Sequence, residues 1–233
     1  MEDISKLLKE LSIDEKAALL AGTDFMFTNP IQRLDIPQIR MSDGPHGLRV
    51  QGNNGDNGVN GSEPATSFPT ACLTACGWNE DNLFKMGKAM GEEARFYNID
   101  VILGPGVNIK RNPLAGRNFE YFSEDPLLAG KMGSAEIKGI QSEGVGACIK
   151  HFALNNAENY RFMGDSVADE RAIREIYLKP FEIAIKTSNP EALMCAYNKI
   201  NGTYCSQNKW LLTDILRNEW GFNGLTMTDW GAT

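Results

Sequence analysis

Short runs of apolar residues recur along this chain, and longer segments between them have apolar residues at every third or fourth position. The short runs are typical of buried strands, because glycine, proline or polar residues bound each of them. The expected strands are residues 36–41, 101–103, 145–150, 193–197 and 224–229. The pattern therefore predicts five strands, with two weaker candidates besides them.

The longer segments are typical of amphipathic helices. Ser12 and Glu15 form a capping box before the first of them, and Gly22 is expected to end it. Asp125 is expected to cap another helix, and Pro180 to interrupt a third. The expected helices are residues 12–21, 79–94, 125–141, 169–188 and a last one from 206 or 208 to 220.

Strands that alternate with helices form parallel sheets that the helices cover. The loops after the strands are long and hold most of the unusual polar residues, as they do on the catalytic face of a barrel. We therefore expect an α/β fold, a TIM-like (β/α)8 barrel. A doubly wound sheet is the alternative, which is disfavoured because no Gly-x-Gly-x-x-Gly motif follows a strand. Residues 51–61 are rich in glycine and asparagine and are expected to form a surface loop.

Composition and charge narrow the range of partners. The net charge is −7 and no cluster of lysine and arginine forms a basic stripe, so we expect no nucleic acid partner. No apolar run is long enough to span a bilayer, so we expect no membrane partner. The acidic start is unlike a signal peptide, and the odd number of cysteines, 5, favours reduced thiols; both indicate a cytoplasmic protein. Because paired metal ligands and phosphate-binding loops are lacking, we expect no metal and no cofactor.

Polar clusters follow the expected strands. They are Asp43 with His46 and Arg49, Arg111 with Arg117 and Glu120, Lys150 with His151, Tyr197 with Asn198, and Asp229 with Trp230. Because parallel strands end at the same edge of a sheet, we expect these clusters to meet. Charged and bidentate side chains bind sugar hydroxyls well, and the indole of Trp230 offers a flat face to a sugar ring. The pattern favours a carbohydrate as the small-molecule substrate.

Most of these residues also have a structural interpretation. Asp229 fits a turn or a helix cap, and Arg117 fits an ion pair that ties down a loop. Tyr197 fits a buried phenol, and Arg111 fits a phosphate or carboxylate contact as well as a sugar contact. Lys150 is the hardest to explain in this way, since lysine is rarely buried.

Five segments, in order and spread over nearly the whole chain, together resemble glycoside hydrolase family 3 in its β-glucosidase-type branch. They are SDGPHGLR (42–49), GRNFEYFSEDP (116–126), KHFALNN (150–156), MCAYNKING (194–202) and TDWGA (228–232). One segment alone is unspecific, whereas the combination is specific. The resemblance implies that residues 1–233 are the N-terminal barrel domain, incomplete at its C-terminal end. The last strand and a C-terminal α/β sandwich domain are expected to be absent from the chain.

The resemblance also implies roles for single residues. Asp229 aligns with the catalytic nucleophile of the family. The residues that align with sugar contacts are Asp43, Arg49, Arg117, Lys150, His151, Tyr197 and Trp230. Lys150 and His151 are neighbours, so the strand must leave its regular geometry for both to reach the sugar. The charges of Arg117 and Lys150 are expected to favour the anionic form of Asp229.

The implied reaction is retaining hydrolysis that releases terminal, non-reducing β-D-glucose. A second carboxyl group must protonate the leaving group, about 5–5.5 Å from the nucleophile. In this branch that group is a glutamate of the second domain, and Glu120, Glu124, Glu158 and Glu170 are the substitutes that the chain offers. We therefore expect this chain alone to be inactive or weakly active. The alternatives are a β-xylosidase or α-L-arabinofuranosidase of the same family, or a non-catalytic sugar-binding module.

Overall fold

A sheet of 5 parallel strands forms the centre of the molecule. The computed structural model of the chain describes residues 4–51 and 61–232, so most of the expected surface loop at 51–61 lies outside the described residues. The strands are β3 (Met41–Asp43), β4 (Val101–Leu103), β5 (Gly146–Phe152), β7 (Ala192–Cys195) and β10 (Leu225–Thr228). All the expected strands are present. The first begins later than expected, because residues 36–40 form only isolated bridges.

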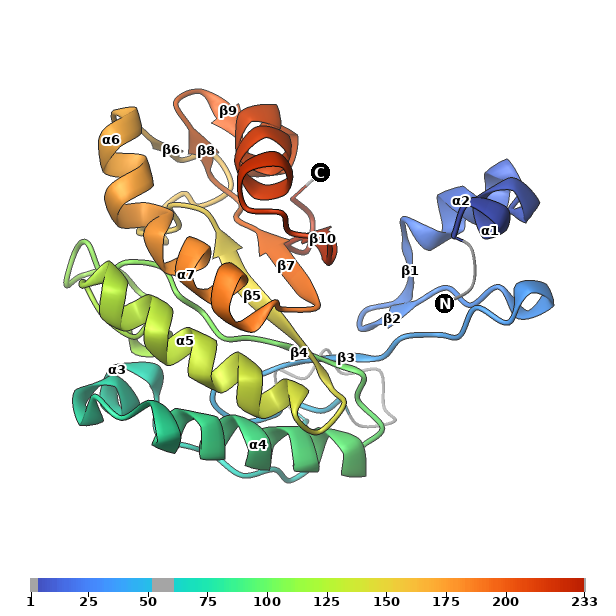
Figure 1. Cartoon of the computed structure of the whole chain (residues 1–233), viewed down its shortest axis with the longest axis horizontal. Coiled ribbons are helices and arrows are strands. Elements are labelled where there is room, and N and C mark those ends of the chain that lie inside the picture. The colour runs from blue at the N-terminus through green and yellow to red at the C-terminus, as the bar shows by residue number, and fades with distance from the viewer. Residues whose placement is uncertain (1–3, 52–60, 233) are drawn as a thin grey trace.

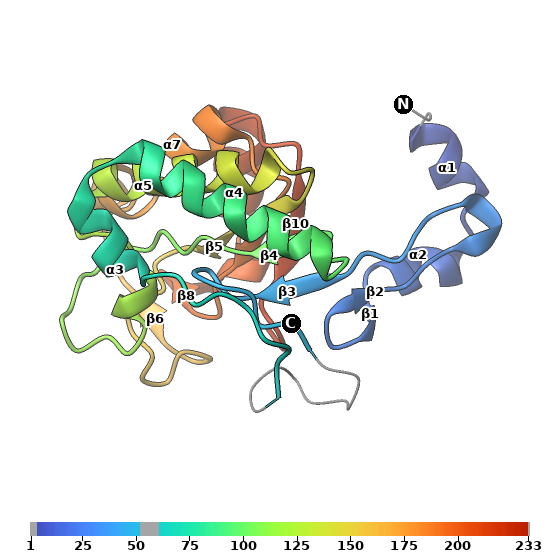
Figure 2. The same cartoon turned by 90° about the horizontal axis from the view of Figure 1, so that it is seen from below.

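Helices connect each strand of this sheet to the next. They are α3 (Ala71–Thr74) and α4 (Glu80–Phe96), α5 (Pro126–Gln141), α6 (Glu170–Ala172) and α7 (Lys179–Ser188), and a π-helical segment, Trp210–Glu219. The strand order across the sheet, β10-β7-β5-β4-β3, follows the order along the chain. Helices α4, α5 and α7 lie together on one side of the sheet (Figures 1 and 2). This is the winding of a (β/α)8 barrel, carried through 5 strands and left open at β3 and β10.

The helix boundaries largely follow the signals in the sequence. Ser12 and Glu15 form the predicted capping box of α2 (Ile13–Leu19), and Asp125 caps α5 by accepting a hydrogen bond from the Leu127 amide. The expected interruption near Pro180 is present, since residues 173–177 form a π-helical turn between α6 and α7. The prediction for Gly22 is wrong, because α2 ends before it and the glycine begins a strand.

Several short elements were not predicted. They are α1 (Ile4–Glu10), the hairpin of β1 (Gly22–Asp24) and β2 (Phe27–Thr28), and a small sheet of β6 (Asp165–Ser166), β8 (Lys199–Ile200) and β9 (Thr203–Tyr204). Helices α1 and α2 and the hairpin form an N-terminal arm that extends away from the helical layer (Figure 1). Within the described residues, every helix is too short or too polar to cross a membrane.

Helix α5 lies between α4 and α7 and is the most buried helix of the layer. Gly139 allows α4 to approach closely, because a Cβ atom there would lie 2.2 Å from the carbonyl oxygen of Phe84. Glu136, on the same helix, is 1% exposed, and its Oε1 atom has no hydrogen-bond partner among the described residues. Burial raises the pKa of Glu136 well above its ordinary value, because the charged form would lose its hydration there.

We predict that Glu136→Gln stabilises the protein above about pH 5 and flattens the pH dependence of its stability. The folded state holds a proton on Glu136 that the unfolded chain releases near the ordinary glutamate pKa, so stability falls as the pH rises beyond that value. Thermal unfolding at pH 5 and pH 8 measures the effect, with a larger gain in Tm at pH 8. The exposed Glu92→Gln on α4 is the control, and equal gains in both variants would contradict the prediction.

Candidate active site

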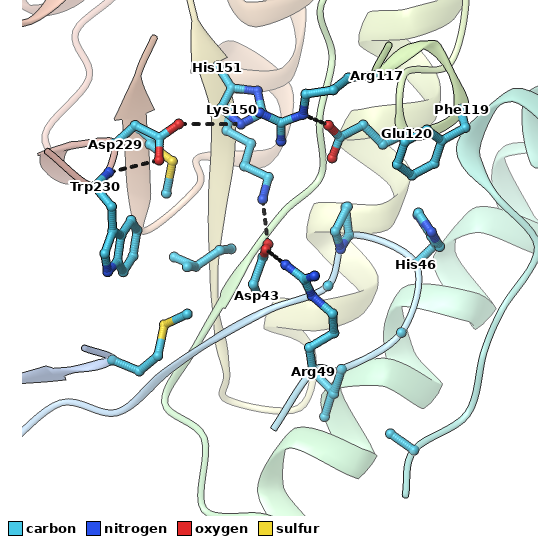
Figure 3. Close-up of a pocket in the computed structure, with 18 of the residues that line it drawn as sticks. Asp43, His46, Arg49, Arg117, Phe119, Glu120, Lys150, His151, Asp229 and Trp230 are labelled. Carbon is cyan, nitrogen blue, oxygen red and sulfur yellow. Dashed lines mark hydrogen bonds and ion pairs between the residues drawn. The ribbon is translucent and has the colours of Figure 1, made fainter. Parts of the chain in front are cut away.

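The polar residues that follow the parallel strands line one pocket at the carboxyl edge of the sheet (Figure 3). Asp43 ends β3, Lys150 and His151 lie near the end of β5, and Tyr197 and Asp229 follow β7 and β10. Loops add Arg49, Arg117 and Trp230, together with His46 and Glu120. The pocket has a volume of about 610 Å³. All the residues that the family resemblance aligned with the nucleophile or with sugar contacts therefore line the same space.

Lys150 is buried in this pocket, and Asp43 balances its charge. Only 3% of the Lys150 side chain is exposed, and its ammonium donates to Oδ1 of Asp43 at 2.7 Å. The guanidinium of Arg49 pairs with Oδ2 of the same carboxylate. Burial alone would raise the pKa of Asp43, but the two cations and the hydrogen bond hold it well below its usual range. Asp43 is therefore a fixed anion.

A second ion pair lies across the pocket from Asp229. Arg117 forms an ion pair with Glu120, as its structural interpretation predicted. Both side chains also line the cavity. His46 lies nearby, with its ring edge-on to Phe119 at a centroid distance of 5.8 Å. Its Nδ1 atom is buried without a hydrogen-bond partner among the described residues. Burial also lowers the pKa of His46, so the neutral ring is favoured.

His151 is held by its backbone and by its ring. The side-chain amide of Asn108 forms two hydrogen bonds with the backbone of His151, each 2.8 Å long. Its oxygen accepts from the His151 N–H, and its NH2 group donates to the His151 carbonyl. The hydroxyl of Tyr121 lies 2.9 Å from Nδ1 and itself accepts a hydrogen bond from Asn155. The other ring nitrogen, Nε2, lies 3.9 Å from Oδ2 of Asp229.

The strand β5 departs from regular pairing where Lys150 and His151 lie. Its register against β7 shifts between Ile149 and Phe152, and the peptide bond between Lys150 and His151 is cis. Both side chains line the pocket, which agrees with the expectation that the strand leaves its regular geometry at this point. Burial lowers the pKa of His151 well below its ordinary value, so its ring is neutral.

Asp229 differs from the other two carboxylates of the pocket, because no lysine or arginine among the described residues forms an ion pair with it. It is 8% exposed, and its Oδ1 accepts a hydrogen bond from the Trp230 N–H at 2.8 Å. The Tyr197 hydroxyl donates to the Trp230 carbonyl at 2.8 Å. Burial raises the pKa of Asp229, although the Trp230 N–H, Tyr197 and the two nearby cations lower it. Lys150 and Arg117 thus favour the anionic form as expected, but desolvation, which the sequence analysis did not consider, outweighs them.

Several pocket residues were not singled out in the sequence. Arg161 lines the cavity, pairs with Glu158 at 3.0 Å, and stacks over the Tyr197 ring at 4.8 Å. Phe25 and Met26 reach the pocket from the N-terminal hairpin, which lies far from it in the chain. Arg161 lies in a polar loop that follows the KHFALNN segment, so its position in the sequence could have indicated that it lines the pocket. Nothing in the sequence indicates the two hairpin residues.

Other expected residues lie elsewhere. Arg111 lines a separate cavity with Lys110 and Trp78, so it does not join the cluster of Arg117 and Glu120. Asn198 is 5% exposed, and its NH2 group donates to backbone carbonyls. Within residues 4–51 and 61–232, no group of three or more His, Cys, Asp or Glu side chains could hold a metal ion.

Comparison with known proteins agrees with this geometry. Residues 16–233 match the N-terminal domain of glycosyl hydrolase family 3. The chain belongs to glycoside hydrolase family 3. The chain is 53% identical over 211 residues to thermostable β-glucosidase B of Acetivibrio thermocellus, with 90% of this chain and 28% of that protein aligned. It is 48% identical over 207 residues to an exo-α-(1→6)-L-arabinopyranosidase of Bifidobacterium longum, with 88% of this chain and 27% of that protein aligned.

Solved structures of the family have the same fold. The β-glucosidase of Kluyveromyces marxianus in complex with glucose superposes with a TM-score of 0.95 at 48% identity, over 99% of this chain and 27% of that one. The family 3 chain described here thus spans about a quarter of the length of the curated relatives that it matches. The pocket at the carboxyl edge of its sheet is the candidate active site of this family 3 domain.

We predict that Asp43→Asn lowers the free energy of unfolding by about 2–4 kcal/mol, because it leaves the buried Lys150 without a counter-charge. Lys150→Met costs less, since Asp43 keeps its pairing with Arg49. Urea unfolding of both variants and of the double variant measures the coupling between the two residues. The double variant is expected to lose less free energy of unfolding than the two single variants lose together. Strictly additive losses would contradict the pairing of Asp43 with Lys150.

Proposed function

We propose that this pocket binds the terminal, non-reducing β-D-glucosyl unit of a glycoside, and that the intact protein hydrolyses the glycosidic bond with retention. The observation that carries the proposal is the state of the carboxylates in the pocket. Asp43 and Glu120 each have a cationic partner, whereas Asp229 has none among the described residues. Asp229 is therefore free to attack a carbon atom, while the other two carboxylates are fixed as hydrogen-bond acceptors.

The pocket has the groups that a sugar ring requires. Asp43 accepts hydrogen bonds from hydroxyl groups, and Lys150, Arg49 and Arg117 donate to hydroxyl oxygens. The Nε2 atom of the neutral His151 faces the space beside Asp229. Trp230 follows Asp229 directly and offers an apolar face to the ring. The relative from Kluyveromyces marxianus with 48% identity was solved with glucose bound, which supports glucose as the sugar.

In the proposed reaction Asp229 attacks the anomeric carbon, forms a covalent glycosyl-enzyme, and releases the leaving group. A second carboxyl group protonates the leaving oxygen and later removes a proton from water. The other carboxylates lining the pocket among the described residues, Asp43 and Glu120, are both engaged in ion pairs, so they suit this acid poorly. We propose that the acid/base group belongs to a part of the protein outside this chain, since the relatives are several times longer.

The burial of Asp229 fits the nucleophile role only if the pocket keeps it ionised. Desolvation raises its pKa, whereas the Trp230 N–H, the Tyr197 phenol and the nearby cations oppose that rise. A partly desolvated carboxylate attacks more readily than a fully hydrated one, because less water has to leave it. The acid side of any pH profile is therefore expected to lie above the ordinary aspartate pKa.

A pentose is the second candidate for the sugar. The Bifidobacterium longum relative is named as an exo-α-(1→6)-L-arabinopyranosidase and is 48% identical to this chain. The β-xylosidase and α-L-arabinofuranosidase alternatives belong to the same family. Aryl glycosides of each sugar separate these possibilities, and a pentoside cleaved faster than the glucoside would change the assigned substrate. A purely sugar-binding module would cleave none of them.

We predict that the chain hydrolyses 2,4-dinitrophenyl β-D-glucoside, whose leaving group needs no proton, and cleaves an alkyl β-D-glucoside about 10²–10⁴-fold more slowly than a complete enzyme does. Asp229→Asn should lower the dinitrophenyl activity about 10³-fold or more. Initial rates with both substrates test this. Rapid cleavage of the alkyl glucoside would contradict the proposal that the acid/base group lies outside this chain. Full activity of Asp229→Asn would contradict the assignment of Asp229 as the nucleophile.

A further inference from the structure

A second cavity, separate from the candidate active site, lies between α3 and the loop that joins β4 to α5. Figure 1 shows α3 at one end of the helical layer. The cavity has a volume of about 680 Å³, within the range of about 300–1,000 Å³ that is typical of sites for small molecules. The residues that decide its chemistry are Cys72, Cys76, Trp78, Lys110, Arg111 and Glu124. None of them has a role in the proposed function.

Two cations in this cavity lack a counter-charge. Among the described residues, no carboxylate forms an ion pair with Lys110 or Arg111, although Glu124 lines the same cavity. The chain has a net charge of −7, so two neighbouring cations without a partner are unusual in it. Burial lowers the pKa of Lys110, and its interaction with Cys72 and Cys76 opposes that fall, so its ammonium lies near both thiols. The cavity is therefore suited to an anion.

The same cavity contains both cysteines of the chain that are not buried. Cys76 is exposed and Cys72 is partly exposed. Cys148, Cys195 and Cys205 are buried, and burial raises the pKa of each of these thiols to about 12. Because the thiolate is the nucleophilic form, the three buried cysteines react poorly near neutral pH. Thiol chemistry on the folded chain is therefore confined to this cavity.

Cys72 and Cys76 are poorly placed for a disulfide with each other. They are four residues apart on a helical segment, where Cβ atoms lie about 5–6 Å apart, whereas a disulfide needs about 3.5–4.5 Å. The Cys76 thiol donates instead to the carbonyl of Cys72 at 3.2 Å, and the Cys72 sulfur lies 3.2 Å from the Thr70 hydroxyl. A sulfur partner for Cys76 must therefore come from outside the chain.

We propose that this cavity is an S-thiolation site, at which Cys76 exchanges with a small disulfide that carries carboxylate groups. The Cys76 thiol gives its proton to solvent, and the thiolate attacks one sulfur of the disulfide. The bond between the two ligand sulfurs breaks, and a new sulfur–sulfur bond joins Cys76 to the bound half. The other half leaves as a thiolate with the electron pair of the broken bond and takes a proton from solvent.

The charges around Cys76 identify the class of ligand. Lys110 and Arg111 donate to the carboxylates of the bound half, and Glu124 can accept from an ammonium group on it. The indole of Trp78 is 74% exposed and offers an apolar face to its aliphatic part. A half with two carboxylates and one ammonium group is a thiol-containing peptide of the glutathione type. The site goes beyond the proposed function and does not depend on it.

Incubation of the folded full chain with oxidised glutathione, followed by peptide mass spectrometry, tests the site. We expect one glutathionyl group per chain, attached to Cys76. Cystamine, a disulfide with two ammonium groups and no carboxylate, is the comparison. Each rate at Cys76 is divided by the rate at the same residue in the urea-unfolded chain. On this scale oxidised glutathione should react about 3- to 10-fold faster than cystamine, and about 1 M sodium chloride should remove most of the difference.

Variants separate the charges from the thiol. Lys110→Met and Arg111→Met should each lower the scaled rate with oxidised glutathione about 2- to 5-fold without lowering the rate with cystamine. Lys138→Met is the matched control, because Lys138 is an exposed lysine of α5 outside the cavity, and it should leave both rates unchanged. Cys76→Ser should abolish the adduct, whereas Cys72→Ser should retain it.

Three results would overturn the proposal. One is an equal scaled rate for oxidised glutathione and cystamine on the unmodified chain, or a difference that salt does not reduce. Another is an adduct that forms mainly on Cys72 or on a buried cysteine. The third is an unchanged rate with oxidised glutathione in both Lys110→Met and Arg111→Met. The salt experiment uses the unmodified chain, so it decides the question even if a variant fails to fold.

Discussion

The buried pairing of Lys150 with Asp43 is the interaction on which the candidate site depends. Lys150 comes from β5, the middle strand of the sheet, and Asp43 comes from the edge strand β3 on the far side of β4. A buried ammonium is strongly unfavourable without a counter-charge, so the pair fixes the end of β5 relative to the loop after β3. Once β5 is fixed, His151 faces Asp229, which follows the opposite edge strand, β10.

The distribution of charge in the pocket follows from this arrangement. Asp43, which ends β3, and Glu120, in the loop with Arg117, each have a cationic partner. Asp229, which follows β10, forms no ion pair with a lysine or arginine in the described part of the chain. One side of the pocket is thus suited to hold hydroxyl groups, and the other side has a carboxylate that no lysine or arginine of the described residues pairs with. In the reaction that we propose, the first side holds the sugar and Asp229 on the second side attacks the anomeric carbon.

The sequence predicted the sheet and most of the pocket because their signals are local. Each strand is an apolar run ended by polar residues, and parallel pairing brings those ends together. The sequence did not predict the contribution of the N-terminal arm, because Phe25 and Trp230 are 205 residues apart and meet through a backbone carbonyl. Arg111 was placed with Arg117 in error, since the loop between them turns it towards another cavity. The pKa of Asp229 depends on burial, which a list of neighbouring charges does not contain.

The most direct test of the central claim is to trap the covalent intermediate on this chain. 2,4-Dinitrophenyl 2-deoxy-2-fluoro-β-D-glucoside has a leaving group that needs no acid, and its fluorine slows the hydrolysis of the glycosyl-enzyme. Incubation followed by peptide mass spectrometry should find one fluoroglucosyl group, attached to the side chain of Asp229. A label on another carboxylate, or no label under conditions in which D-glucose binds, would contradict the account.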